Sequence, residues 1–262
     1  MVPPSPVHTS PPRLRTRLGL RLASPLSILV LVPALVVGVG AFMAVSGQSS
    51  LRASIDTMAE ARFVDQTAQA SRHIQDMLGQ ADPLLDGFRA FVREHETRPS
   101  PFAMAEHLAT AMHARSGLSF VSLGYPEGHL TGVYLDDEGH FWLTDRRVGD
   151  DGRSHLVDYR IPAVGPPILE REDPDCGYDV RTRPFYELAL LRGRRTWTEP
   201  YVFFDSGLPG VTRAEPLWGS DGELQGVLSA DFNLNDLSDF VDGLDTVPAG
   251  RVFVFTAEGA LL

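Results

Sequence analysis

The pattern of apolar and polar residues begins with a long uncharged run. No charged residue occurs from Leu22 to Val45, and about 20 apolar residues are enough for a helix that crosses a bilayer. The charged residues before this run are all arginines, which favours a cytoplasmic N-terminus. We therefore predict a cytoplasmic tail over 1–21, a transmembrane helix over 22–45 in the inner (plasma) membrane, and an extracytoplasmic location for 46–262. A cleaved signal peptide is the alternative, but its apolar run is usually only about 7–15 residues.

The next segment predicts a long stalk helix over 46–98. Apolar residues between Ile74 and Val92 recur at steps of three and one, which places them on one face of a helix. Pro83 lies within this stripe and predicts a kink. We expect the distal half to pack on its own domain. The half near the membrane is poor in apolar residues, and we expect it to pair with a second copy in a homodimer.

After a second helix, the period of the pattern changes from helical spacing to two. Ser100 is a favoured N-cap residue and Pro101 suits the first helical position, so a helix is predicted from there to about Arg115. Three strands of an antiparallel meander are then predicted, with turn residues between them. These strands are Leu118–Gly124, Leu130–Leu135 and Phe141–Thr144.

The remaining pattern predicts that a loop and a short helix interrupt the sheet. We expect an edge strand over His155–Ile161, a long loop over 162–180 and a short helix over Pro184–Leu191. Three further strands and a helix over 234–244 follow. The strands are Tyr201–Phe204, Val211–Leu217 and Leu224–Phe232. The fold class is therefore α+β, with a largely antiparallel sheet.

Composition restricts the partners and the chemistry. The chain has 34 acidic and 23 basic residues and a net charge of −11, so we expect no nucleic-acid partner, which would require a basic face. No lysine is present, which excludes phosphate-loop and Schiff-base lysines. The single cysteine, Cys176, excludes an internal disulfide and a cysteine-based metal cluster.

No catalytic motif emerges from the sequence. There is no nucleophile elbow, no zinc-protease helix motif and no glycine-rich phosphate loop. His107 and His113 are six residues apart, which does not place them on one helix face as a metal pair. We therefore expect no enzymatic activity, no cofactor and no metal. The alternative is a membrane-anchored extracytoplasmic enzyme, such as a hydrolase, with an unrecognised site.

Candidate binding chemistry is concentrated between Tyr178 and Asp231. The fork of Arg183 can hold a carboxylate with two hydrogen bonds, aromatic faces such as those of Phe185 and Tyr201 can shelter an ammonium group, and Asp231 can pair with that group. Such a pocket suits a small ligand, namely an amino acid, an amine or a carboxylate. Each residue taken alone also has a purely structural explanation. Arg183 can be a surface ion-pair partner, Phe185 a core residue and Asp231 a helix cap.

The order of three short motifs resembles the double Cache family of extracytoplasmic sensor domains in bacterial membrane receptors. The motifs are Arg183-Pro184-Phe185-Tyr186, Trp197-Thr198-Glu199-Pro200-Tyr201 and a strand from Gly226-Val227 to Asp231-Phe232. The resemblance implies a PAS-like Cache module over 99–247 and the start of an incomplete second module over 248–262. It also implies a small-molecule ligand and transmembrane signalling to an output domain such as a histidine kinase or a chemotaxis module.

Amino-acid-binding members of that family resemble this sequence further. By position, the resemblance implies five ligand-binding residues: Tyr178, Arg183, Phe185, Tyr201 and Asp231. Two positions depart from the family pattern. The family usually has tryptophan at position 185, and it has aspartate where this chain has Phe203. Asp205 lies two residues further along.

Overall fold

The computed structural model describes residues 25–95, 97–113, 115 and 117–235. The chain divides into two compact units, Met1–Glu60 and Ala61–Leu262. Helix α1 (Pro25–Gly79) begins in the first unit and ends in the second. The predicted transmembrane helix over 22–45 falls on the first part of α1. Among the described residues, no helix is both long and apolar enough to cross a bilayer.

Several predicted segments lie outside the described residues. They are the tail over 1–21, most of the helix over 234–244, and the segment 248–262.

The predicted stalk helix over 46–98 is two helices. The interruption lies at Gln80, between α1 and α2 (Ala81–Glu94). Pro83 explains its position, because proline has no N–H to donate to the carbonyl one turn earlier, at Gly79. Helix α2 buries Ala81, Leu84, Leu85 and Phe88. This burial confirms that the distal half of the predicted stalk packs on its own domain.

Helix α3 (Pro101–His113) leads into the sheet. Its predicted N-cap is confirmed, because the Ala103 N–H donates to Ser100 Oγ at 3.2 Å. The described residues form nine antiparallel strands: β1 (Leu118–Gly124), β2 (Leu130–Leu135), β3 (Phe141–Val148), β4 (Ser154–Ile161), β5 (Ile168–Asp173), β6 (Thr196–Trp197), β7 (Tyr201–Val202), β8 (Pro209–Trp218) and β9 (Leu224–Asn233). Their order is β5-β4-β3-β2-β1-β9-β8-β6, and β7 also pairs with β8. The turn η1 (Val180–Thr182) and helix α4 (Pro184–Arg192) connect β5 to β6.

The antiparallel meander is confirmed, with three corrections to the strands. Strand β5 lies inside the predicted loop 162–180, so β4 is not an edge strand. Strand β3 continues past Thr144 to Val148. The predicted strand over Tyr201–Phe204 is shorter in the structure and ends at Val202.

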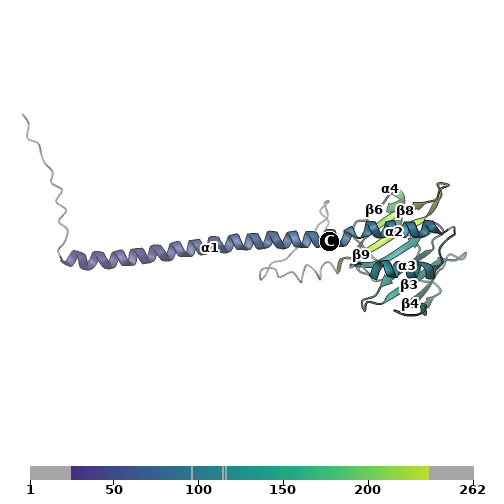
Figure 1. The fold of residues 1–262 in the computed structure, drawn as a ribbon, viewed down its shortest axis with the longest axis horizontal. Helices are drawn as coiled ribbons and strands as arrows, with labels where there is room; N and C mark the ends of the chain where they lie inside the picture. The colour runs from purple at the N-terminus through teal and green to yellow at the C-terminus, as the bar shows by residue number, and fades with distance from the viewer. Residues whose placement is uncertain (1–24, 96, 114, 116, 236–262) are drawn as a thin grey trace, which may run out of the picture. The chain divides into compact units, whose positions relative to one another are not determined.

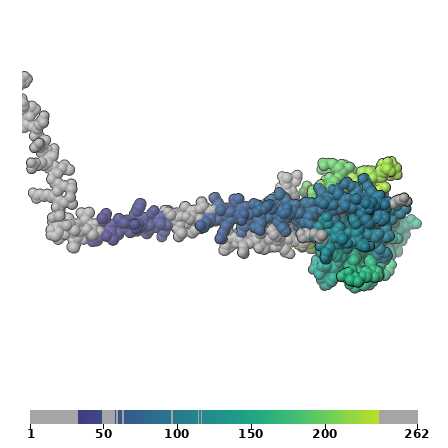
Figure 2. Space-filling view, viewed as in Figure 1, coloured from purple at the N-terminus to yellow at the C-terminus, as the bar shows by residue number. Residues whose placement is uncertain are grey.

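Alternation along the strands gives the sheet two different faces. Helices α2 and α3 lie side by side over one face (Figures 1 and 2) and form the larger apolar core with residues such as Val121, Leu143 and Phe232. The opposite face carries α4 and a smaller cluster that includes Tyr178 and Phe185. This second face holds the cavity described next.

Candidate ligand-binding site

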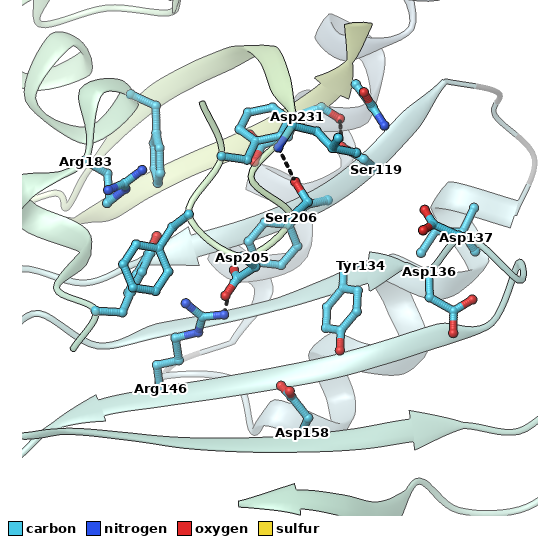
Figure 3. A pocket seen from close by; sticks show the side chains of 18 of the residues that line it. Ser119, Tyr134, Asp136, Asp137, Arg146, Asp158, Arg183, Asp205, Ser206 and Asp231 are labelled. Carbon is cyan, nitrogen blue, oxygen red and sulfur yellow. Dashed lines mark hydrogen bonds and ion pairs between the residues drawn. The ribbon is translucent and has the colours of Figure 1, made fainter. Parts of the chain in front are cut away.

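A cavity of about 320 Å³ opens on the face of the sheet opposite α2 and α3. This volume is at the lower end of the range typical of small-molecule sites. Its floor comes from strands β1 to β5 and β9, and the turn between β7 and β8 forms one wall (Figure 3). All five predicted site residues line it: Tyr178, Arg183, Phe185, Tyr201 and Asp231.

Arg183 is positioned by the start of α4. Its backbone is extended (φ −87°, ψ 142°), as the residue before a proline must be, and Pro184 occupies the first helical position. The guanidinium lies 5.7 Å from the ring centre of Tyr178 and 5.4 Å from that of Phe204. Within the described part of the chain it forms no ion pair. The structural alternative, a surface ion-pair partner, therefore has no support among these residues.

Asp231 anchors a short hydrogen-bonded chain across β8 and β9. Thr212 is its cross-strand partner, and the Thr212 hydroxyl donates to Asp231 Oδ1 at 2.8 Å. The Tyr201 hydroxyl lies 2.7 Å from the same Thr212 oxygen. Since the hydrogen of Thr212 is directed to Asp231, Tyr201 donates to Thr212.

Burial changes the acidity of Asp231. Removal from water raises its pKa to about 7, although the hydrogen bond from Thr212 and the charge of Arg183 act in the opposite direction. Near neutral pH this carboxyl group is therefore poised between its neutral and ionised forms, and a cationic ligand group would favour the ionised form. Asp231 is not the helix cap of the structural alternative, because Asn233 Oδ1 accepts from the Asn235 N–H instead.

Arg146, on β3, is a cavity residue that the sequence patterns missed. Its side chain is 4% exposed, and Nη2 donates to Asp205 Oδ2 at 2.7 Å. Its guanidinium also lies 4.3 Å from the ring centre of Tyr178. Asp205 is thus paired with a protein cation. The predicted strand ended at Thr144. Arg146 was therefore not recognised as a strand residue whose side chain lies on the cavity face.

Aromatic side chains close the cavity near Tyr201. The ring of Phe203 meets that of Tyr201 edge-on, with centres 5.2 Å apart. A Cβ atom at Gly210 would lie 2.1 Å from the Phe203 ring, so glycine is required there. Phe185 is both a core residue and a cavity residue, since it is buried and lines the cavity. Trp197 packs on Phe232 in the larger core and does not line the cavity.

The two histidines in and beside α3 have separate surroundings. His107 stacks on Phe91 with ring centres 4.2 Å apart, and His113 lies against Phe141. In the described ranges there is no group of three histidine, cysteine or acidic residues that could hold a metal ion.

One family model matches part of the chain. Residues 167–239 match the family described as "Methyl-accepting chemotaxis protein-like, first PDC sensor domain". The matched segment contains all five predicted site residues and the strands that carry Thr212 and Asp231. The predicted resemblance to bacterial receptor sensor domains is confirmed over this segment.

Two curated relatives are chemoreceptors. The chain is 36% identical over 113 residues to methyl-accepting chemotaxis protein McpA of Pseudomonas putida, an alignment that covers 42% of this chain and 17% of McpA. It is 31% identical over 111 residues to methyl-accepting chemotaxis protein PscA of Pseudomonas syringae pv. tomato, covering 42% of this chain and 16% of PscA. The matched part is thus less than a fifth of either receptor.

Solved sensor domains resemble the chain more distantly. The ligand-binding domain of the Pseudomonas aeruginosa amino-acid chemoreceptor PctC, in complex with GABA, has a TM-score of 0.48 and 20% identity, covering 76% of this chain and 72% of that domain. The corresponding domain of PctB, in complex with L-Arg, has a TM-score of 0.49 and 20% identity, covering 78% and 64%. Likenesses of this size do not bear on the ligand of this chain.

Proposed function

We propose that the described domain is the sensor module of a membrane receptor and that it binds a small ligand bearing a carboxylate, with an amino acid as the best fit. The observation that carries this proposal is the pairing of two groups in one cavity. Arg183 has a guanidinium without an ion pair among the described residues, and Asp231 has a buried carboxyl group whose pKa is raised by burial. An α-amino acid brings a carboxylate for the first and an ammonium group for the second. The curated relatives are receptors, which favours this function over a hydrolase.

The ammonium group has one carboxylate available to it near Arg183. Phe203 stands where the related motif has an aspartate, and Asp205 is paired with Arg146. Asp231 is left to hold the ammonium, with the ring of Tyr201 beside it. We therefore expect the carboxylate contact to contribute more to affinity than the ammonium contact.

The test is a thermal-shift screen of the full chain against L-amino acids, amines and organic acids. A ligand at about 100 times its dissociation constant should add about 2.7 kcal/mol of stability. The stabilising compound is then titrated against Arg183→Ala. Removing one partner of a buried charge pair costs about 2–5 kcal/mol, so affinity should fall by roughly 30- to 3,000-fold. Arg183→Lys should recover little, because an ammonium lacks the planar fork.

Arg181→Ala is the matched control. Arg181 lies two residues away but is ion-paired with Asp179 at 2.6 Å and is outside the cavity. Its replacement should leave affinity unchanged. Equal affinity of wild type and Arg183→Ala would reject the proposed function, and equal losses from both variants would indicate diffuse electrostatic attraction.

The extracytoplasmic location rests on the charge asymmetry of the sequence. A reporter enzyme fused after Leu262 should be active only outside the cytoplasm. Activity of the fusion inside the cytoplasm would reject this topology. Pairing of two copies through the membrane-near half of the stalk stays a prediction, which cysteine crosslinking along residues 48–62 would test.

A further inference from the structure

The end of the cavity far from Asp231 contains a buried carboxylate with an unused acceptor. Asp158, on β4, has a side chain that is 4% exposed, and its Oδ1 atom has no hydrogen-bond partner. Figure 3 shows this carboxylate directed into the cavity, with the hydroxyl end of Tyr134 pointing toward it. A buried carboxylate without a full set of partners is destabilising, so its retention at a cavity wall calls for an explanation.

The neighbouring arginines leave this acceptor unused. Arg146 is held by Asp205 and by the ring of Tyr178. Arg171 approaches the other oxygen of Asp158 no closer than 3.8 Å, and its side chain is 60% exposed. Burial accordingly raises the pKa of Asp158, although the Thr144 hydroxyl and both arginines act in the opposite direction.

The charges lining the cavity are predominantly negative. Five aspartates line the whole cavity, against three arginines, Arg146, Arg171 and Arg183. The aspartates are Asp136, Asp137, Asp158, Asp205 and Asp231. An anionic ligand group could use the donor Arg146 Nη1, which is unpaired among the described residues, but would meet this excess of negative charge, and an apolar group would leave Asp158 without a partner. A cationic group that donates hydrogen bonds satisfies both conditions.

The distance across the cavity suits a single extended ligand. The guanidinium carbons of Arg146 and Arg183 lie 4.3 and 5.7 Å from the centre of the same Tyr178 ring, so they are at most about 10 Å apart. Asp158 is on the strand next to Arg146. A ligand with a straight side chain of several methylene groups is therefore long enough to extend from Arg183 past Arg146 toward Asp158.

We propose that Asp158 and Tyr134 form a second subsite for a cationic side-chain group, so that the ligand is a basic amino acid with a terminal ammonium or guanidinium group. This inference rests on the proposed function, because the ligand's carboxylate is held by Arg183. Arg183 then selects for a carboxylate at one end, and Asp158 selects for a cation at the other.

The experiment compares L-lysine with L-norleucine, which has the same straight chain without the terminal ammonium. Both are titrated calorimetrically against the full chain. We expect wild type to bind lysine at least tenfold more tightly, which corresponds to about 1.4 kcal/mol. In Asp158→Asn the ratio should fall to about one, with norleucine affinity unchanged. A shorter basic amino acid, 2,3-diaminopropionate, should bind wild type much more weakly than lysine does.

Asp145→Asn is the matched control, because Asp145 is a buried aspartate on the neighbouring strand β3 but faces away from the cavity. It should keep the preference for lysine. Asp158→Asn should fold, since it removes a buried charge without changing the shape of the side chain. A melting temperature at or above that of wild type would verify this.

Equal affinity of wild type for lysine and norleucine would overturn the subsite, as would an undiminished preference for lysine in Asp158→Asn. Failure of both compounds to bind would overturn it as well. In each case, a ligand from the screen that requires Arg183 would show that the proposed function survives without this inference.

Discussion

The two faces of the sheet are built from the same strands but bury different kinds of side chain. On the face covered by α2 and α3, residues such as Val121, Leu143 and Phe232 are apolar and fully buried. On the other face, the same strands β9 and β4 present Asp231 and Asp158, which are also buried. Apolar burial on the first face stabilises the fold. The buried carboxyl groups on the second face oppose folding, and we propose that they hold the ligand.

This difference separates the residues that carry stability from those that we propose to carry recognition. Alternation along a strand allows adjacent residues to serve either purpose. Ala230 belongs to the larger core, while the next residue, Asp231, lines the cavity. Substitutions on the helix-covered face should therefore change stability, and substitutions on the cavity face should change affinity and pH dependence.

The largest expected effect is on the helix-covered face. Phe88 is 0% exposed in the centre of the larger core, so Phe88→Ala should lower the free energy of unfolding by about 3–5 kcal/mol. Urea denaturation would measure this loss. Leu191→Ala, at a side chain that is 80% exposed, should change the free energy of unfolding by less than about 0.5 kcal/mol. Comparable losses from the two variants would contradict the assignment of the core.

The next effect concerns pH and the cavity face. The pKa of Asp231 is about 7 in the folded protein, against an ordinary value of 3.8. Between these values the folded state binds a proton that the unfolded state releases, so the free energy of unfolding should fall as the pH rises from about 4 to 7 and then level off. The whole change is roughly 4 kcal/mol. Asp231→Asn should remove this part of the slope, measured as the difference from wild type across the pH range. If the free energies of unfolding of wild type and Asp231→Asn changed with pH in parallel, the raised pKa of Asp231 would be contradicted.

A smaller effect is expected when the hydrogen-bonded chain from Tyr201 through Thr212 to Asp231 is interrupted. Thr212→Val keeps the shape of the side chain but deprives Asp231 of a donor and Tyr201 of an acceptor. We expect a loss of about 1–3 kcal/mol and a further rise in the pKa of Asp231, because the Thr212 hydrogen bond lowers it. The pH dependence should then end at a higher pH. Thr196→Val, outside the cavity, serves as the control. It should change neither the free energy of unfolding nor the pKa of Asp231.

The smallest expected effect lies on the helix-covered side. Ser100→Ala removes the N-cap of α3 and should cost about 1 kcal/mol in denaturation experiments. Ligand affinity should be the same as in wild type, since Ser100 is outside the cavity. A change in affinity would show that the two faces are not independent.

The helices and strands were predictable from the sequence where neighbouring residues alone define their bounds. Strands β1 and β2 have the predicted bounds, because apolar alternation and turn residues define them. Strand β3 was predicted too short at the charged run Asp145-Arg146-Arg147. Arg147 pairs with Asp145 inside the run, but Asp145 also binds Thr131, and Arg146 binds Asp205, both from elsewhere in the chain. Strand β5 was missed because it is a charged and mostly exposed edge strand, and charge is how natural edges avoid aggregation.

The sequence alone determined which residue types meet at the start of α4 and at the end of β9, because backbone rules and strand alternation act locally. The resemblance to the double Cache family, which rests on short local motifs, named Tyr178, Arg183, Phe185, Tyr201 and Asp231 as ligand-binding residues, and the structure places all five at the cavity. Only the tertiary structure decided which groups near them are paired. Arg146 and Asp205 are 59 residues apart in sequence, and the unused acceptor of Asp158 follows from where Arg146 and Arg171 come to lie. Pairing and desolvation depend on distances between segments that are remote in the chain, and no local pattern encodes those distances.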